Sequence, residues 1–138
     1  METMTQENKE LLLKDLCARL NTNLVCSIYR TDDYGVGYRD EILSGYCKGD
    51  IWYEFYFGDD CGIGIDDVSK IKPYLFPLSS MTEEQKKEYA HILVMSSNLA
   101  CSQLIGETTQ DWFNKNHFDY RGLIPKGLAE DATDKNIY

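Results

Sequence analysis

The chain lacks long apolar runs and a secretory leader. The longest apolar runs, such as Leu11–Leu13 and Ile92–Met95, fall far short of the roughly 20 residues that span a bilayer. The segment from Met1 to Glu7 has neither the basic region nor the apolar region of a secretory signal. These absences predict a cytoplasmic protein that makes no contact with a membrane.

Basic charge is also scarce. Lysine and arginine number 14 against 23 aspartates and glutamates, which gives a net charge of −9. Sequence-independent binding to nucleic acid depends on positive side chains that displace counterions from phosphates. The composition therefore argues against direct nucleic-acid binding.

The cysteines are odd in number, widely spaced and free of any C-x-x-C pair, so neither a disulfide framework nor a zinc site is predicted. Reduced thiols that pack as small apolar groups fit this pattern better. The five are Cys17, Cys26, Cys47, Cys61 and Cys101.

Acidic doublets occur at 32–33, 59–60 and 66–67, but none has the glycine and the distal glutamate of a calcium-binding EF-hand loop. We interpret them as solvated turn residues. The glycine pairs at 35/37 and 62/64 lack the lysine of a phosphate-binding loop. The sequence thus predicts no metal and no cofactor.

Apolar residues make up 43% of the 138 residues, which is enough to build one hydrophobic core. Residues 1–138 are therefore predicted to form a single domain. Its first element is a helix from Gln6 to Leu20, with leucines at the i, i+3, i+4 spacing of one buried stripe. Lys14 and Arg19 are expected on the polar side, and either Thr3 with Gln6, or Thr5, can cap the start.

The middle third alternates with the period of β-strands. Short connections between the strands require antiparallel pairing, because parallel pairs need long crossovers. The predicted strands are Leu24–Arg30, Tyr38–Cys47, Ile51–Phe57 and Cys61–Ile65.

Two of these strands carry specific expectations about faces. Leu24, Cys26 and Ile28 should lie on one face of the first strand. In the second, the even spacing predicts a common side for Tyr38, Ile42 and Tyr46. The ten tyrosines of the chain are suited to half-buried strand positions or to an exposed aromatic surface that binds a protein or stacks on a planar ligand.

The last part of the chain is predicted to be helical after an extended connector. Two prolines in Ile71–Met81 exclude a regular helix. The connector should bring four residues to the core, namely Tyr74, Leu75, Phe76 and Leu78. A capping box from Thr82 to Gln85 starts a helix that reaches Leu93 or beyond. Thr108 or Thr109 starts another that ends near Asn116, and an irregular tail follows from His117.

The predicted fold class is therefore α+β: an N-terminal helix, an antiparallel meander of three to four strands, and C-terminal helices packed on one face of the sheet.

Two stretches carry a resemblance. They are IKPYLxPLSSMTEExKKE, from Ile71 to Glu88, and NHFDYRGLIxKGLA, from Asn116 to Ala129; the opening Glu10–Leu20 adds to them. Together they cover about a third of the chain and resemble short uncharacterised proteins of gut Bacteroidetes and of their phages and mobile elements. Many members have arginine where Phe76 stands here. The resemblance implies a phage or mobile-element setting in the host cytosol, and no activity.

We therefore expect a non-enzymatic binding protein, a counter-defence factor that blocks a host immune protein or sequesters a small nucleotide signal. Aromatic side chains would stack on a base, and basic or hydroxyl side chains would bind phosphate. The candidate ligand-binding residues are Lys72, Ser79, Ser80, Trp112, His117, Tyr120 and Arg121.

Two alternatives remain beside this expectation. An acidic protein can imitate nucleic acid and inhibit a host nuclease, which predicts carboxylates aligned on one face. A small hydrolase could use His117 with Asp119 or a carboxylate pair, although no spacing supports such a site. Nor does the spacing support a nucleophilic pair of Cys101 with a histidine. Self-association into a homo-oligomer is left open by the sequence.

Overall fold

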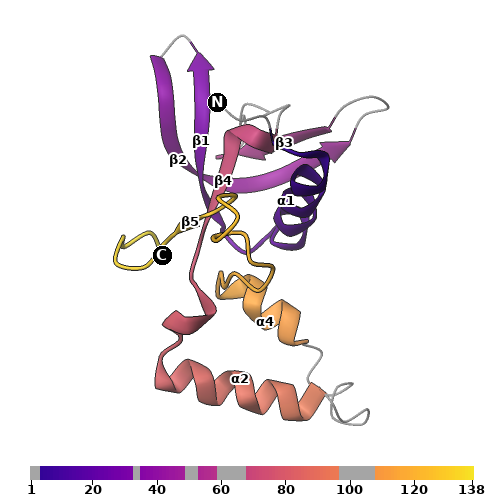
Figure 1. The fold of residues 1–138 in the computed structure, drawn as a ribbon, viewed down its shortest axis with the longest axis vertical. Helices are drawn as coiled ribbons and strands as arrows, with labels where there is room; N and C mark the ends of the chain where they lie inside the picture. The colour runs from indigo at the N-terminus through magenta and orange to yellow at the C-terminus, as the bar shows by residue number, and fades with distance from the viewer. Residues whose placement is uncertain (1–3, 33–34, 49–52, 59–67, 97–107) are drawn as a thin grey trace.

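The computed structural model describes residues 4–32, 35–48, 53–58, 68–96 and 108–138. Its α+β class agrees with the prediction: an N-terminal helix, a five-stranded sheet and C-terminal helices (Figure 1). The predicted strand at Cys61–Ile65, the acidic doublets at 59–60 and 66–67, and Cys101 lie outside the described residues.

Helix α1 (Gln6–Ala18) is confirmed close to its predicted bounds. The Thr5 side chain accepts a hydrogen bond from the Asn8 backbone N–H and caps its start, as expected. Leu12 and Leu16 are fully buried against the sheet. The expectation for Arg19 was wrong, because this residue is fully buried just past the helix end, where it has polar partners.

The sheet has the order β3-β2-β1-β4-β5. Strands β1 (Val25–Asp32), β2 (Gly35–Lys48) and β3 (Tyr53–Phe57) form the predicted antiparallel meander. The long β2 pairs with β1 along its first half and with β3 along its second, and it bends between them (Figure 1). Leu24, just before β1, lies on one face with Cys26 and Ile28, as predicted, and all three are completely buried.

A β-bulge in β2 overturns the expectation that Tyr46 shares a side with Tyr38 and Ile42. Leu43 pairs with Phe57 and Gly45 pairs with Tyr56, so one extra residue is inserted in β2. An extra residue reverses the alternation of side chains beyond it. Tyr46 therefore packs against the core, while Tyr38 and Ile42 are exposed on the opposite face.

The connector is extended, as expected, and its part Ile71–Leu75 also joins the sheet as strand β4, antiparallel to β1. The Val25 N–H donates to the Tyr138 hydroxyl, which lies on the β4 side because it donates in turn to Tyr74 O. Backbone groups alternate along a strand, so the N–H of Ser27 also points toward β4. Ser27 and its partner Lys72 therefore exchange the ladder hydrogen bonds, and Pro73 stands at a position whose N–H would point away from β1. Beyond β4, Leu78 is exposed rather than in the core.

The C-terminal elements complete the fold. The short β5 (Glu130–Asp131) runs parallel to β4, which makes the sheet mixed. Helices α2 (Glu83–Ser96) and α4 (Thr109–Lys115) both begin with a capping box. The box at Thr82 was predicted, and at Thr108 a cap was predicted. The two helices pack on each other at one end of the sheet (Figure 1), around a cluster of Ile92 with the aromatic residues Trp112, Phe113 and Phe118.

Candidate functional site

One face of the β1–β2 hairpin is open. Helix α1 covers the side of the sheet that carries Cys26, Ile28 and Leu43. The opposite side chains of β2, from Val36 through Tyr38, Asp40 and Ile42 to Ser44, are all exposed. The residues of β1 that pair with Ile42, Asp40 and Tyr38 are Val25, Ser27 and Tyr29. We call Val25, Tyr29, Val36, Tyr38, Asp40 and Ile42 the open face.

The open face is unusually apolar for a surface. Val36 is 72% exposed, Tyr38 60% and Ile42 47%. Tyr29 packs edge-on against Tyr38, with ring centroids 5.2 Å apart, so the two aromatic rings form one raised patch. Contiguous exposed apolar side chains of this kind mark interaction surfaces more often than single ones do.

Asp40 gives the open face its negative charge. The Tyr74 hydroxyl donates to Asp40 Oδ1 at 2.7 Å, which fixes the carboxylate between β2 and β4. Burial, followed by this hydrogen bond and the charge of Asp40, raises the pKa of Tyr74, so its phenol stays protonated and continues to donate. The carboxylate is therefore an oriented anion beside apolar groups.

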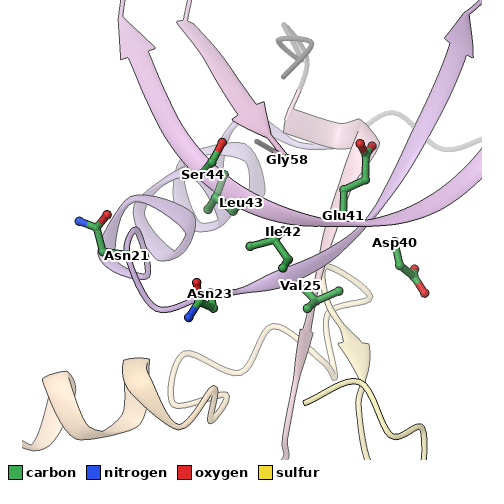
Figure 2. Close-up of a pocket in the computed structure, with 9 residues that line it drawn as sticks. All are labelled: Asn21, Asn23, Val25, Asp40, Glu41, Ile42, Leu43, Ser44 and Gly58. Atoms are coloured by element: carbon green, nitrogen blue, oxygen red, sulfur yellow. The ribbon is translucent and has the colours of Figure 1, made fainter. Parts of the chain in front are cut away.

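A pocket of about 570 Å³ continues the open face where β1 begins (Figure 2). Val25 and Ile42 lie opposite each other in its wall, and Asp40 and Glu41 supply carboxylates. Glu41 already pairs with the buried Arg30, which leaves Asp40 as the carboxylate exposed to solvent. No lysine, arginine or histidine is among its lining residues, which are Asn21, Asn23, Val25, Asp40, Glu41, Ile42, Leu43, Ser44 and Gly58.

The predicted ligand-binding residues lie elsewhere, and the structure does not gather them around this pocket. Lys72 is half-buried on β4 and forms an ion pair with Glu130 at 3.8 Å. Ser79 is exposed in the short helix η2 (Leu78–Ser80), while Ser80 donates its hydroxyl to Pro77 O.

Trp112 and His117 serve internal contacts. Trp112 is fully buried, and its Nε1–H donates to Glu88 Oε1 at 3.0 Å, which ties α4 to α2. His117 follows α4 with a φ of 61°, donates Nε2–H to Thr22 O at 2.7 Å, and stacks on the Tyr138 ring at 3.8 Å. Burial lowers the pKa of His117, which favours its neutral form.

Tyr120 and Arg121 are the predicted site residues that the structure does bring together. The Arg121 Nη2 donates to the Tyr120 hydroxyl, and its guanidinium lies 4.7 Å from the Tyr120 ring centre. The Arg121 Nε also donates to Asp15 Oδ1 at 3.2 Å. Both side chains are thus engaged in the packing of α1 against the C-terminal segment.

Asp15 and Arg19 form the centre of that packing. Arg19 donates from Nε and Nη2 to the two oxygens of Asp15, at 2.9 and 3.2 Å. It also donates to the backbone carbonyls of Phe113 and Phe118. Across the described residues, no buried side-chain nitrogen or oxygen lacks a partner, so this polar cluster is satisfied within the fold.

The remaining sequence candidates are likewise accounted for as far as the structure describes them. Asp119 accepts hydrogen bonds from the backbone N–H groups of Leu123 and Ile124, at 2.8 and 2.9 Å. Cys26 is buried, and burial raises the pKa of its thiol. Within the described residues, no group of three or more histidine, cysteine or acidic side chains could hold a metal ion.

The sequence indicates an exposed aromatic surface but does not locate it on the open face. Val36, Tyr38, Asp40 and Ile42 alternate with residues of the opposite face, and this pattern is visible in the sequence. The pattern alone does not reveal which of the two faces α1 covers.

Comparisons with known proteins add no relative. No family model, no curated protein and no solved structure matches this chain. Among the described helices, none is both long and apolar enough to cross a bilayer.

Proposed function

We propose that this protein is a non-enzymatic binding protein that holds a protein partner on its open face. The observation that carries the proposal is the row of Val36, Tyr38 and Ile42 on one side of one strand, each about half exposed or more. Burying such a patch against a partner is favourable by about 25 cal/mol per Å² of apolar surface. Aromatic side chains are enriched in interfaces of this kind.

Charge identifies the partner as basic. The chain carries a net charge of −9, and Asp40 lies among the apolar residues of the open face. A positively charged partner gains in rate of association and in specificity from this complementarity. A second copy of the chain would bring two charges of −9 together, so we favour a different protein over a homo-oligomer.

A nucleotide fits the described pocket less well than a protein does. Phosphate recognition needs cationic or backbone donors, whereas the pocket residues include Asp40, whose carboxylate is exposed, and no basic residue. The basic side chains expected to bind phosphate have partners of their own, Glu130 for Lys72 and Asp15 for Arg121.

Imitation of nucleic acid also finds less support. Such an inhibitor needs carboxylates spaced along one surface in place of phosphates. The open face has Asp40 with Tyr38 and Ile42 on either side of it along the strand, which is a mixed apolar and acidic pattern. That pattern favours a protein interface.

The resemblance to proteins of phages and mobile elements supplies the biological setting of the proposal. In that setting the partner is a host defence protein, and binding in the host cytosol blocks it. The counter-defence role rests on this resemblance, whereas the choice of surface rests on the open face.

Photo-crosslinking tests the proposal. A benzophenone amino acid in place of Tyr38 should form a crosslink to a basic protein when the chain is expressed in a gut Bacteroidetes host. The matched control carries the same group in place of the exposed Glu84 on α2, and should not crosslink to that protein. Equal crosslinking from both positions, or none from position 38, would contradict the proposal.

A further inference from the structure

The backbone of β2 has one edge that faces β1 and another that faces away. The Leu43 N–H donates to Leu24 O at 2.8 Å, so the backbone groups of Leu43 point toward β1. The Gly58 N–H donates to Ile42 O at 3.0 Å from the opposite side. Because backbone groups alternate along a strand, those of Val36, Tyr38 and Asp40 point the same way as those of Ile42, away from β1.

In the described part of the chain, no strand pairs with this outer edge between Val36 and Asp40. The β2–β3 ladder begins only at Leu43, and β1 pairs with β2 on the other side. In Figure 1 the first half of β2 projects with β1 away from β3. Three successive outward positions therefore offer N–H and C=O groups to a further strand.

This edge lacks most of the usual protections against strand addition, although Asp40 places one charged side chain on it. Exposed edges commonly carry lysine or proline or are interrupted by a bulge. The outward positions here are Val36, Tyr38 and Asp40, and the bulge of β2 comes later, between Leu43 and Gly45. The register with β1 is regular over the whole segment.

We propose that the outer edge of β2, from Val36 to Asp40, accepts an extended segment of the partner as an additional strand of the sheet. This inference rests on the proposed function and specifies how the partner binds. Main-chain hydrogen bonds would supply affinity, and alternate side chains would supply specificity.

The chemistry of the open face defines the partner segment. Every second side chain of an added strand would lie on the same face as Val36, Tyr38 and Asp40. Apolar side chains suit the positions beside Val36 and Tyr38, and a lysine or arginine suits the position beside Asp40. The segment is thus extended, basic and apolar.

Amide hydrogen exchange of the free protein tests whether the edge is open. The N–H groups of Gly37 and Arg39 face β1, so they should exchange slowly. Those of Tyr38 and Asp40 should exchange at rates close to those of an unstructured chain. Slow exchange at Tyr38 and Asp40 as well would show that the edge is already covered, and would overturn the inference.

A strand-forming probe tests the binding mode. The probe is an acetylated and amidated octapeptide in which every second residue is lysine, valine, valine and valine in turn, with threonine between them, so that one face presents both kinds of side chain. Its control has glutamate in place of the lysine. The lysine peptide should slow amide exchange at Tyr38 and Asp40, and the glutamate peptide should not. Failure of the lysine peptide to bind at this edge would overturn the inference.

Two variants separate main-chain from side-chain contributions. Tyr38→Ala keeps the outward N–H, whereas Tyr38→Pro removes it at an edge position where proline is tolerated. The proline variant should bind the lysine peptide about fivefold or more weakly than the alanine variant, which corresponds to one hydrogen bond. Slow exchange at Gly37 and Arg39 in both variants verifies the fold, and Val36→Pro replaces Tyr38→Pro if that verification fails.

Equal binding by the alanine and proline variants would refute strand addition. The proposed function would survive that result, because crosslinking from position 38 reports contact with the open face whatever the backbone does. Loss of the crosslink would instead refute the proposed function itself.

Discussion

Asp15 is fully buried, and its carboxylate forms ion pairs with two arginines. Arg19 and Arg121 both donate to it, and Arg19 continues to two backbone carbonyls of the C-terminal segment. A buried charge is tolerated only when partners compensate its lost hydration. The cluster therefore fastens α1 to the segment after α4.

Removing the carboxylate should be severe. Asp15→Ala leaves the buried guanidinium of Arg19 without its anion, and we expect a loss of about 3–5 kcal/mol in the free energy of unfolding. Urea denaturation followed by circular dichroism measures it. Lys14→Ala, at the exposed neighbouring position, should change stability by less than about 0.5 kcal/mol. Similar losses in the two variants would contradict this account of the cluster.

His117 should make stability depend on pH. Its pKa is lowered from 6.5 by burial, so below that pH the unfolded chain binds a proton that the folded chain resists. The contribution of neutral His117 to the free energy of unfolding is complete above about pH 6.5, the pKa of the unfolded chain. This contribution is lost as the pH falls toward the lower pKa of the folded state.

The variant His117→Asn tests this dependence, since asparagine tolerates the positive φ of the site. Between pH 8 and pH 5 it should lose less stability in urea titrations than the unaltered chain does. His91→Asn, on the exposed side of α2, should show the full loss. A pH dependence unchanged by His117→Asn would show that the histidine titrates alike in both states.

At the scale of elements, α2 depends on its cap. Thr82 accepts from the Gln85 N–H at 3.1 Å, and the Thr82 N–H donates to Gln85 Oε1 at 2.9 Å. Thr82→Ala should destabilise the helix by about 1 kcal/mol and speed amide exchange in its first turns. Glu84→Ala, which leaves both hydrogen bonds in place, serves as the control. Unchanged exchange in Thr82→Ala would mean that packing alone holds this end.

Elements with local signals could be predicted from the sequence. The Thr5, Thr82 and Thr108 caps and the alternation of β1 depend on neighbours within a few residues. The bulge of β2 has no such signal, and it reversed the predicted side of Tyr46. Strand β4 was not predicted because proline cannot donate a ladder hydrogen bond. Whether Pro73 interrupts the pairing depends on its register with β1, which the sequence does not show.

The candidate site was harder to predict for the same reason. Arg19 lies at a helix end where solvent was expected, but its carbonyl partners are more than 90 residues away. The aromatic and basic residues of the Asn116–Ala129 stretch suggested a ligand site, whereas Arg121 is engaged with Tyr120 and Asp15. Residue type indicates chemistry, but only the fold shows which groups have internal partners.

At the scale of the whole molecule, its negative charge should govern association. If a basic protein binds the open face, added salt screens the attraction and weakens the complex. The fraction of complex in size-exclusion chromatography should fall as sodium chloride is raised from 0.05 to 0.5 M, a range in which screening shortens from more than about 10 Å to a few ångströms. A complex insensitive to salt would mean that apolar contacts alone hold the partner.

Native mass spectrometry of the chain recovered from the lysate of Bacteroidetes cells that express it tests the central claim most directly. We expect the mass of the chain plus a basic protein, and we expect Val36→Ser/Tyr38→Ser/Ile42→Ser to lose that partner while Leu78→Ser, exposed outside the open face, retains it. A chain that carries only a small molecule, or a protein partner retained equally by the triple variant, would contradict binding through the open face.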